Sequence, residues 1–256
     1  MQDKVALVTG AGSGIGEASA RMLAARGARV TLVGRTADEL EEVAQGVREA
    51  GGEALVAVAD VSDEEAVAEA VRATLAEFGR LDTIVANAGV NGTWAGIDDL
   101  SVEDFRSTLD INLTGTFITI KAGVPHMNRG GSVVVIASVN GSRIFSNTGA
   151  TAYSASKAGQ IAITKMLAVE LGPRGIRVNV ICPGAIDTEI SDNTNAQNED
   201  VKIPVEFPQG NIPLTGSEPG SSEQVAELVT FLSSDAASHI SGTEVWIDGA
   251  QSLLQG

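Results

Sequence analysis

The sequence has 256 residues, 43% of them hydrophobic, and its 33 acidic and 17 basic side chains give a net charge of −16. A chain this acidic would be repelled by a polyanion or an anionic membrane surface, so neither nucleic acid nor a membrane is an expected partner. One cysteine and two histidines argue against a disulfide framework and a metal site. With no apolar run near the ~18 residues of a membrane span and no signal-peptide pattern at the start, we expect a cytoplasmic protein.

Short apolar runs alternate with longer segments of helical periodicity along the whole chain. The apolar runs are typical of buried strands, and they cover residues 5–8, 30–33, 55–58, 83–86, 133–136, 178–181 and 245–247. Helical patterns cover residues 14–26, 101–110, 111–127 and 151–171. Capping boxes at 36–39, 62–65 and 221–224 predict three further helices, of which the first two run toward Ala50 and Phe78.

This alternation predicts an α/β fold. Strands joined by helical crossovers form a parallel sheet with helices on both faces, and the right-handed crossovers give a Rossmann-like, doubly wound sheet, here of seven strands. No break in composition, repeat or low-complexity tract divides the chain, so we expect one domain over residues 1–256.

One long segment, residues 187–222, interrupts this succession. It contains four prolines and three glycines, and loops of this length within a compact domain are usually functional or disordered. It follows the carboxyl end of a strand, where open α/β sheets bind ligands, so we interpret it as a lid rather than as a surface excursion. The apolar side chains that would cover a substrate are Ile190, Ile203, Val205, Phe207, Ile212 and Leu214.

A glycine-rich turn, TGAGSGIG over residues 9–16, follows the first predicted strand. Glycines let the backbone approach a pyrophosphate, and the next helix would direct its free N–H groups and positive dipole end at the anion. The strict G-x-G-x-x-G fingerprint fails because Ile15 or Glu17 stands at the third glycine, and the P-loop fails because no Lys follows. A tight turn without a ligand is the alternative.

The second pattern is Tyr153 and Lys157, which lie four residues apart in a predicted helix and so share a face. A nearby ammonium favours the phenolate, so we expect Lys157 to bring the pKa of Tyr153 down toward the working range. A solvated Tyr/Lys pair is the alternative. An acyl-transfer pair of Ser154 and Lys157 is disfavoured, because the companion Ser-Asp-Asn and Lys-Thr-Gly elements are absent.

Together these patterns resemble the short-chain dehydrogenase/reductase family, over essentially the whole chain. The turn with Gly10, Gly14 and Gly16 resembles its cofactor loop, and Asn87-Ala88-Gly89 resembles its motif after the fourth strand, with Ala86 where an Asn is usual. Pro183-Gly184 resembles the turn that holds the nicotinamide. The residues that fall on the catalytic tetrad are Asn112, Ser138, Tyr153 and Lys157. The joint order and spacing of the motifs carry the resemblance.

The resemblance implies a role for each catalytic residue. Tyr153 would exchange a proton with the substrate oxygen, and Ser138 would hydrogen-bond the carbonyl. Lys157 would bind the nicotinamide ribose and lower the pKa of Tyr153. Asn112 would position a water that links Lys157 to solvent, although the sequence alone also suits a helix-capping Asn. The hydride transfer itself would be the chemistry of the cofactor.

The resemblance also implies a cofactor half, about residues 1–130, and a catalytic and substrate half, about residues 131–256. Asn87 would brace the sheet near the ribose, the pair Asp60-Val61 would contact adenine, and Ile186 and Thr188 would contact the carboxamide and phosphates. The implied cofactor-binding residues are Gly10, Ser13, Gly14, Ile15, Gly16, Arg35, Asp60, Val61, Asn87, Ala88, Gly89, Tyr153, Lys157, Pro183, Gly184, Ile186 and Thr188.

The residues after the second strand bear on the choice of cofactor. An acid there would bind the ribose 2′-OH and reject a 2′-phosphate, but this chain has Gly34, Arg35 and Thr36. Gly34 leaves room and Arg35 can pair with a phosphate, so we predict NADP(H) over NAD(H). Stacking of Arg35 on adenine and the absence of a basic residue at Ser13 keep NAD(H) possible.

The implied activity is an NAD(P)-dependent oxidoreductase that transfers a hydride between nicotinamide and a ketone or secondary alcohol. A 3-oxoacyl thioester reductase, for which Arg129 and Arg174 would form a basic patch, and a sugar dehydrogenase are alternatives within the family. A non-catalytic dinucleotide-binding module is the alternative of another class. We expect a neutral substrate, because the lid carries the acidic residues Asp192, Glu199, Asp200 and Glu206.

Family resemblance further implies a homotetramer formed through the segments 111–127, 151–171 and 251–256. The large acid excess has two explanations, solubility and adaptation to high salt, of which we favour the first on charge logic alone.

Overall fold

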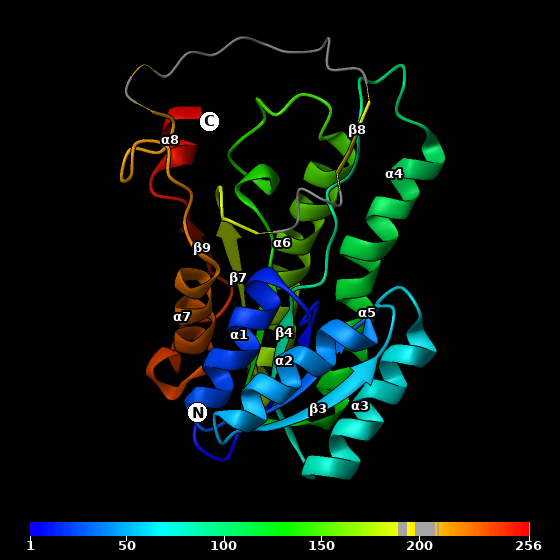
Figure 1. Ribbon diagram of the computed structural model, residues 1–256, viewed down its shortest axis with the longest axis vertical. Helices are drawn as coiled ribbons and strands as arrows, with labels where there is room; N and C mark the ends of the chain where they lie inside the picture. The colour runs from blue at the N-terminus through cyan, green and yellow to red at the C-terminus, as the bar shows by residue number, and fades with distance from the viewer. Residues whose placement is uncertain (189–193, 198–207, 209, 256) are drawn as a thin grey trace.

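The computed structural model describes residues 1–188, 194–197, 208 and 210–255. Strands and helices alternate along it in the expected order (Figure 1). The strands are β1 (Val5–Thr9), β2 (Arg29–Gly34), β3 (Glu53–Val58), β4 (Leu81–Ala86), β5 (Gly92–Trp94), β6 (Met127–Ile136), β7 (Arg177–Pro183), β8 (Thr194–Ala196) and β9 (Glu244–Ile247). The helices are α1 (Gly14–Ala25), α2 (Ala37–Glu49), α3 (Glu64–Phe78), α4 (Val102–Leu109), α5 (Gly115–Gly123), α6 (Thr151–Leu171), α7 (Ser222–Ser233) and α8 (Gln251–Gln255).

Seven parallel strands form the central sheet, in the order β3-β2-β1-β4-β6-β7-β9. The strand order reverses between β1 and β4, so the loops after these two strands diverge and leave a crevice at the carboxyl edge of the sheet. Strands β1 and β4 are buried along their whole length, which explains why they are continuous apolar runs rather than alternating patterns. The predicted doubly wound sheet is confirmed.

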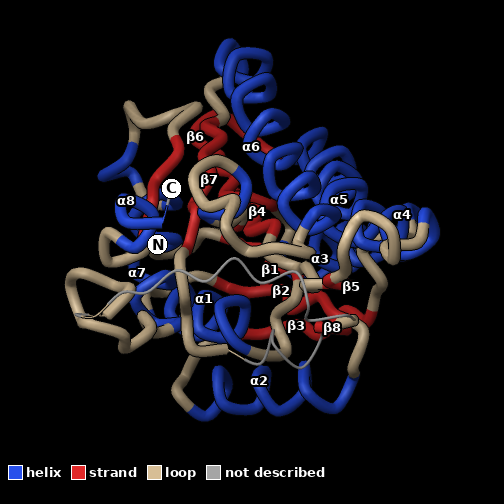
Figure 2. Tube along the Cα trace, turned by 90° about the horizontal axis from the view of Figure 1, so that it is seen from above, coloured by secondary structure: helices blue, strands red, loops and turns tan. Residues whose placement is uncertain are grey.

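Helices cover both faces of the sheet, as the view in Figure 2 shows. One core lies between the sheet and α1, α2 and α7, where Leu23, Leu40 and Val229 are buried. The other lies between the sheet and α3, α5 and α6, where Val71, Ile120 and Ile161 are buried. The sheet is therefore held rigidly, and the loops at its carboxyl edge are left to bind ligands.

The helix starts show where local sequence chemistry predicts correctly and where it does not. Ser221 caps α7 with the predicted capping box, completed by Gln224. Helix α3 starts one residue later than predicted, because the carboxylate of Asp60 takes both the N–H and the hydroxyl of Ser62, at 2.9 and 2.6 Å, which leaves Asp63 as the cap. Thr36 occupies the N-cap of α2, but no cap bond to its side chain occurs in the described structure, so the predicted box is wrong there.

The two helices predicted over 101–110 and 111–127 are joined in one continuous helical run of mixed type. A π-helical turn, Asp110–Thr114, precedes α5, and a short 3₁₀ turn, Val124–His126, follows it. The π-turn lets the buried Asn112 point its side chain inward, where that side chain bonds the backbone of Val90. Single π-turns of this kind occur inside α-helices, frequently at functional sites, and hydrophobic periodicity does not reveal them.

The loop region predicted as a lid contains a strand that periodicity missed. Strand β8 pairs in parallel with β5, and the two form a small separate sheet that lies beside the start of α6 (Figure 2). Farther along, Ile212 is buried and Leu214 is exposed. The other apolar and acidic side chains named for the lid lie outside the described residues, so its role as a lid stays a prediction.

Candidate active site

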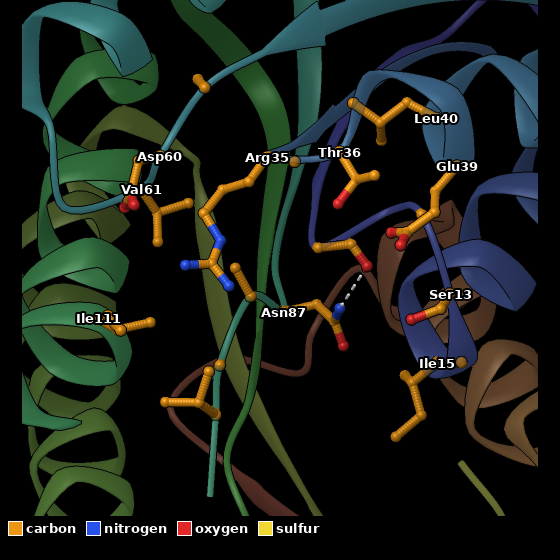
Figure 3. A pocket seen from close by; sticks show the side chains of 18 of the residues that line it. Ser13, Ile15, Arg35, Thr36, Glu39, Leu40, Asp60, Val61, Asn87 and Ile111 are labelled. Atoms are coloured by element: carbon orange, nitrogen blue, oxygen red, sulfur yellow. Dashed lines mark hydrogen bonds between the residues drawn. The ribbon is translucent and has the colours of Figure 1, made fainter. Parts of the chain in front are cut away.

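A pocket lies at the carboxyl ends of β1, β2, β3 and β4, at the point where the strand order reverses (Figure 3). It gathers most of the residues predicted to bind the cofactor, from segments far apart in the sequence. Those that line it are Gly10, Ser13, Gly14, Ile15, Arg35, Asp60, Val61, Asn87, Ala88, Gly89 and Thr188. The predicted nucleotide site is thus assembled in one place.

The glycine turn has the close packing that a phosphate cradle requires. Gly10 has φ +63, and a Cβ there would lie 2.9 Å from the Cα of Ala88. A Cβ at Gly16 would collide with the carbonyl oxygen of Gly10. Since α1 begins at Gly14, the unpaired N–H groups of its first turn face the pocket beside Ser13 and Ile15. Backbone and dipole together therefore fit the pyrophosphate of a dinucleotide.

Thr9 and Asn87 clamp this turn onto the end of β4. The Thr9 hydroxyl accepts hydrogen bonds from the backbone N–H groups of Asn87 and Ala88, at 3.0 and 3.1 Å. In return, the Asn87 amide donates to the carbonyl oxygens of Thr9 and Gly10, at 3.0 and 3.2 Å. Asn87 thus braces the glycine turn against the end of β4, and its place near a cofactor ribose stays a prediction.

At the other end of the pocket, an Arg and two carboxylates set the charge. The Arg35 side chain is directed into the pocket (Figure 3). Hydrogen bonds from Ser62 hold the pKa of Asp60 below its usual value, and the charge of Arg35 adds to the effect. Glu39, which sequence reasoning missed, lies against the glycine turn, since a Cβ at Gly12 would be 2.9 Å from its carboxylate. This carboxylate opposes the anion that Arg35 favours.

The four predicted catalytic residues come from three different parts of the fold and converge beside this pocket. Ser138 follows β6, Tyr153 and Lys157 lie in the first turns of α6, and Asn112 lies in the π-turn. A Cβ at Gly89, a pocket residue, would lie 3.2 Å from Asn112 Oδ1 and 3.5 Å from Lys157 Nζ. Asn112 and Lys157, two of the four predicted catalytic residues, therefore adjoin this pocket at Gly89.

Burial dominates the electrostatics of Tyr153 and Lys157. Desolvation raises the pKa of Tyr153, against a hydrogen bond with Ser138 that lowers it. Desolvation likewise lowers the pKa of Lys157 to about 8. Lys157 Nζ donates to the carbonyl of Ile136 at 3.0 Å and lies 5.5 Å from the centroid of the Tyr153 ring. The pKa of the phenol is thus raised, where the sequence led us to expect a lowered one, because burial removes its solvent and the opposing influence comes from the hydrogen bond with Ser138.

Asn112 is the centre of a buried hydrogen-bond network, rather than a helix cap. Its amide donates to Ser156 Oγ at 3.0 Å, and the Ser156 hydroxyl donates to the carbonyl of Tyr153 at 2.7 Å. The carbonyl of Asn112 accepts from Thr116 Oγ1 and from Gln160 Nε2, at 2.7 and 2.9 Å. The network fixes the turn of α6 that carries the catalytic pair.

Three residues predicted to contact the nicotinamide end of the cofactor lie outside this pocket, and their role stays a prediction. Pro183 and Gly184 end β7 outside the nucleotide pocket, where Gly184 packs against Asp248 and Gln251. Ile186 bridges to Gly220 rather than lining the pocket. Gly34 and Thr36, which the sequence analysis weighed in the choice of cofactor, line the pocket as well. Pocket residues that the sequence did not point to are Gly12, Glu39, Leu40, Ala59, Val90 and Ile111. Several of them are next in sequence to residues that were predicted, and this is the signal that could have found them. The predicted neighbours are Asp60, Gly89 and Asn112.

Within the described residues, no group of three or more His, Cys, Asp or Glu side chains is arranged to hold a metal ion. The same part of the chain has no helix with the length and apolar character to cross a membrane. Cys182 is buried, and desolvation raises the pKa of its thiol to about 12.

Comparison with known proteins relates this geometry to a family. Residues 10–250 match the sequence profile of a family described as enoyl-(acyl carrier protein) reductase. The chain is 39% identical over 256 residues to the cis-4-hydroxycyclohexanecarboxylate dehydrogenase of Sinomonas cyclohexanicum, covering 98% of each chain. The crystal structure of a 3-ketoacyl-ACP reductase from Sinorhizobium meliloti 1021 is 54% identical, with a TM-score of 0.95 and coverage of 98% of this chain and 99% of that one. A short chain dehydrogenase from Burkholderia cenocepacia J2315 in complex with NADP is 35% identical, with a TM-score of 0.84 and coverage of 97% of each chain.

Proposed function

Because the chain belongs to the short-chain dehydrogenase/reductase family, we propose that Tyr153 is the general acid and base of a hydride transfer between a nicotinamide dinucleotide and a neutral ketone or secondary alcohol. The protein is an oxidoreductase of that family, and it acts on C=O or CH–OH groups. The observation that carries the residue assignment is a chain of contacts that starts at the pocket. Lys157 and Asn112 lie next to the pocket residue Gly89, Lys157 lies against the Tyr153 ring, and Tyr153 is hydrogen-bonded to Ser138.

The cofactor would be held by the glycine turn, by the first turn of α1 and by Asn87, Asp60 and Arg35. When bound, it supplies or accepts the hydride. The raised pKa of Tyr153 keeps the phenol protonated at neutral pH, so its hydroxyl is ready to donate a proton to the oxygen of a ketone. Ser138 hydrogen-bonds the same oxygen. Lys157, with a pKa of about 8, exchanges protons near neutral pH and can reprotonate the phenolate.

We propose NADP(H) as the preferred cofactor. Arg35 lines the pocket next to Gly34, where an acid would otherwise select NAD(H). The NADP complex of the Burkholderia relative supports the same choice. Glu39 moderates the preference, since its carboxylate lies on the same side of the pocket as the glycine turn.

The test of the proposed function is a comparison of Tyr153→Phe with the parent protein in the reduction of a simple ketone. We expect turnover to fall by a factor of about 100 to 10,000, the range for loss of a positioned acid, while fluorescence titration with NADPH gives an unchanged dissociation constant. Ser154→Ala is the matched control, and it should leave the rate unchanged. Equal rates for Tyr153→Phe and the parent, or no turnover by the parent, would support a non-catalytic module instead.

A 3-oxoacyl thioester reductase is the second candidate, because the 54% identical relative is named a 3-ketoacyl-ACP reductase. The guanidinium group of Arg129 donates to the carbonyl of Pro173 at 3.2 Å, so it lies beside the next residue, Arg174. Arg174 in turn donates to the carbonyl of Val124 at 2.7 Å. An acidic carrier protein would be attracted there. A kcat/KM for acetoacetyl thioesters well above that for simple ketones, and its loss in Arg129→Ala, would favour this candidate over the first.

We further propose a cytoplasmic homotetramer. The exposed side chains Phe117 on α5 and Met166 and Val169 on α6 leave apolar surface on the two helices named for assembly. Sedimentation equilibrium should give four times the chain mass, and a monomer would refute the assembly.

A further inference from the structure

An indole ring forms a wall beside the catalytic phenol. The centroids of the Trp94 and Tyr153 rings are 6.5 Å apart, and their planes are tilted by 42°. This is the range of favourable aromatic contacts, so the Trp94 ring packs against the phenol ring whose hydroxyl is the proposed proton donor. The ring comes from β5, which belongs to the small sheet outside the central one (Figure 2).

Hydrogen bonds hold both the indole ring of Trp94 and the backbone that carries it. The indole N–H donates to the carbonyl of Asn91 at 3.2 Å, which sets the ring orientation. On one edge, the Trp94 carbonyl accepts from the N–H of Gln197 at 2.9 Å, and β5 pairs with β8. On the other edge, the next residue, Ala95, donates to the carbonyl of Gly149 at 3.2 Å, two residues before α6 begins. A preorganised flat surface of this kind binds with little loss of entropy.

Each of the two loops beside Trp94 exposes one large apolar side chain. Ile97 and Phe145 are 80% and 70% exposed, on the two loops that meet at the Ala95–Gly149 hydrogen bond. Among the described residues whose side chains interact with Tyr153, Lys157 is the charged one, and its amine already donates to the backbone of Ile136. A substrate held against the Trp94 ring therefore meets a flat apolar surface, and the acidic residues Asp98 and Asp99 that follow Ile97 on its loop disfavour an anion there.

We infer that Trp94 is a specificity-determining residue that selects neutral substrates in which an apolar ring carries or adjoins the reacting carbonyl or alcohol. The inference rests on the proposed function and deepens it by naming the substrate class. A ring presents a flat or puckered face that stays in contact with the indole while the oxygen reaches Tyr153 and Ser138. A linear chain makes the same contact only after its bond rotations are frozen, which costs entropy.

The experiment compares two ketones with equal carbon number, cyclohexanone and hexan-2-one, in the parent, Trp94→Phe and Trp94→Ala. In the parent, kcat/KM should favour the ring. In Trp94→Ala that ratio should fall about tenfold, the size of a lost aromatic wall, mainly through KM, while Trp94→Phe should keep most of it. The kcat for hexan-2-one and its pH profile should stay close to the parent values. Failure of the proposed function would show separately, as absence of turnover with both ketones in the parent.

Fluorescence provides a readout independent of turnover. The chain has two tryptophans, and Trp246→Phe leaves Trp94 as the single one. In this variant, saturated with oxidised cofactor, cyclohexanone should change the emission of Trp94 more, and at lower concentration, than hexan-2-one does. An equal loss of kcat/KM for both ketones in Trp94→Ala, an unchanged ratio, or emission that does not respond to cyclohexanone would overturn the inference.

Discussion

Replacement of Thr9 by Val tests the clamp that holds the cofactor turn. Val has the shape and strand preference of Thr, so the change removes the hydroxyl and little else. The hydroxyl accepts two backbone hydrogen bonds, from Asn87 and Ala88, at 3.0 and 3.1 Å, and donates a longer one, of 3.4 Å, to the carbonyl of Val85. These bonds are among the links between the end of β1 and the end of β4, beneath the glycine turn.

The expected cost follows from the two accepted bonds, because the bond donated to Val85 is long. Each contributes about 0.5–1.5 kcal/mol, so Thr9→Val should lower the free energy of unfolding by about 1–3 kcal/mol. For a chain of this size that is a fall in Tm of about 2–12 °C. Because Asn87 also donates to the carbonyl of Gly10, the turn should loosen, and the KM for the cofactor should rise severalfold.

Thermal unfolding by circular dichroism and steady-state kinetics at varied cofactor concentration measure the two effects. Thr9→Ser keeps the hydroxyl and is the matched control, with a Tm and a cofactor KM close to those of the parent. If Thr9→Val and Thr9→Ser have the same Tm and the same KM, the hydroxyl does not hold the turn and the reasoning fails.

Two further predictions concern charge. Arg35→Leu should reduce kcat/KM with NADPH about 10- to 100-fold and leave kcat/KM with NADH nearly unchanged. Glu39→Gln should shift the ratio of kcat/KM with NADPH to kcat/KM with NADH the other way, toward NADPH. Equal effects of either substitution on both cofactors would refute the assignment. The pKa of Lys157 is about 8 in the folded protein and near 10.5 in the unfolded chain, so the unfolded state binds more protons between pH 8 and pH 10.5. The buried amine therefore destabilises the fold most below pH 8 and less as the pH rises. Urea unfolding should therefore show the parent gaining about 2 kcal/mol relative to Lys157→Met from pH 8 to pH 10, and a pH-independent difference would contradict the burial of this amine.

Local patterns in the sequence were sufficient to predict the strands of the central sheet and the long helix α6. The strands of the central sheet are apolar runs bounded by turns, and helix α6 begins and ends where its pattern and the following Gly172-Pro173 predict. The four-residue spacing of Tyr153 and Lys157 is by itself enough to place them on one face of that helix. In each case the information lies within a few residues of the feature that it determines.

Tertiary packing decided the features that depend on residues distant in sequence. Glu39 reaches the pocket because α2 packs beside the glycine turn, and Trp94 meets Tyr153 because β5 and α6 lie together. Asn112 turns inward through a π-turn whose partners, Val90 and Ser156, are 22 and 44 residues away.

Tyr153 and Lys157 show most clearly what the local sequence determined and what tertiary packing decided. The sequence determined that a phenol and an amine would be neighbours, and it predicted attraction between them. The depth of their burial, set by the sheet and helices packed around them, determined that desolvation dominates both pKa values. A pKa depends on the solvent removed from a group as well as on its neighbours, and only the complete fold specifies how much solvent is removed.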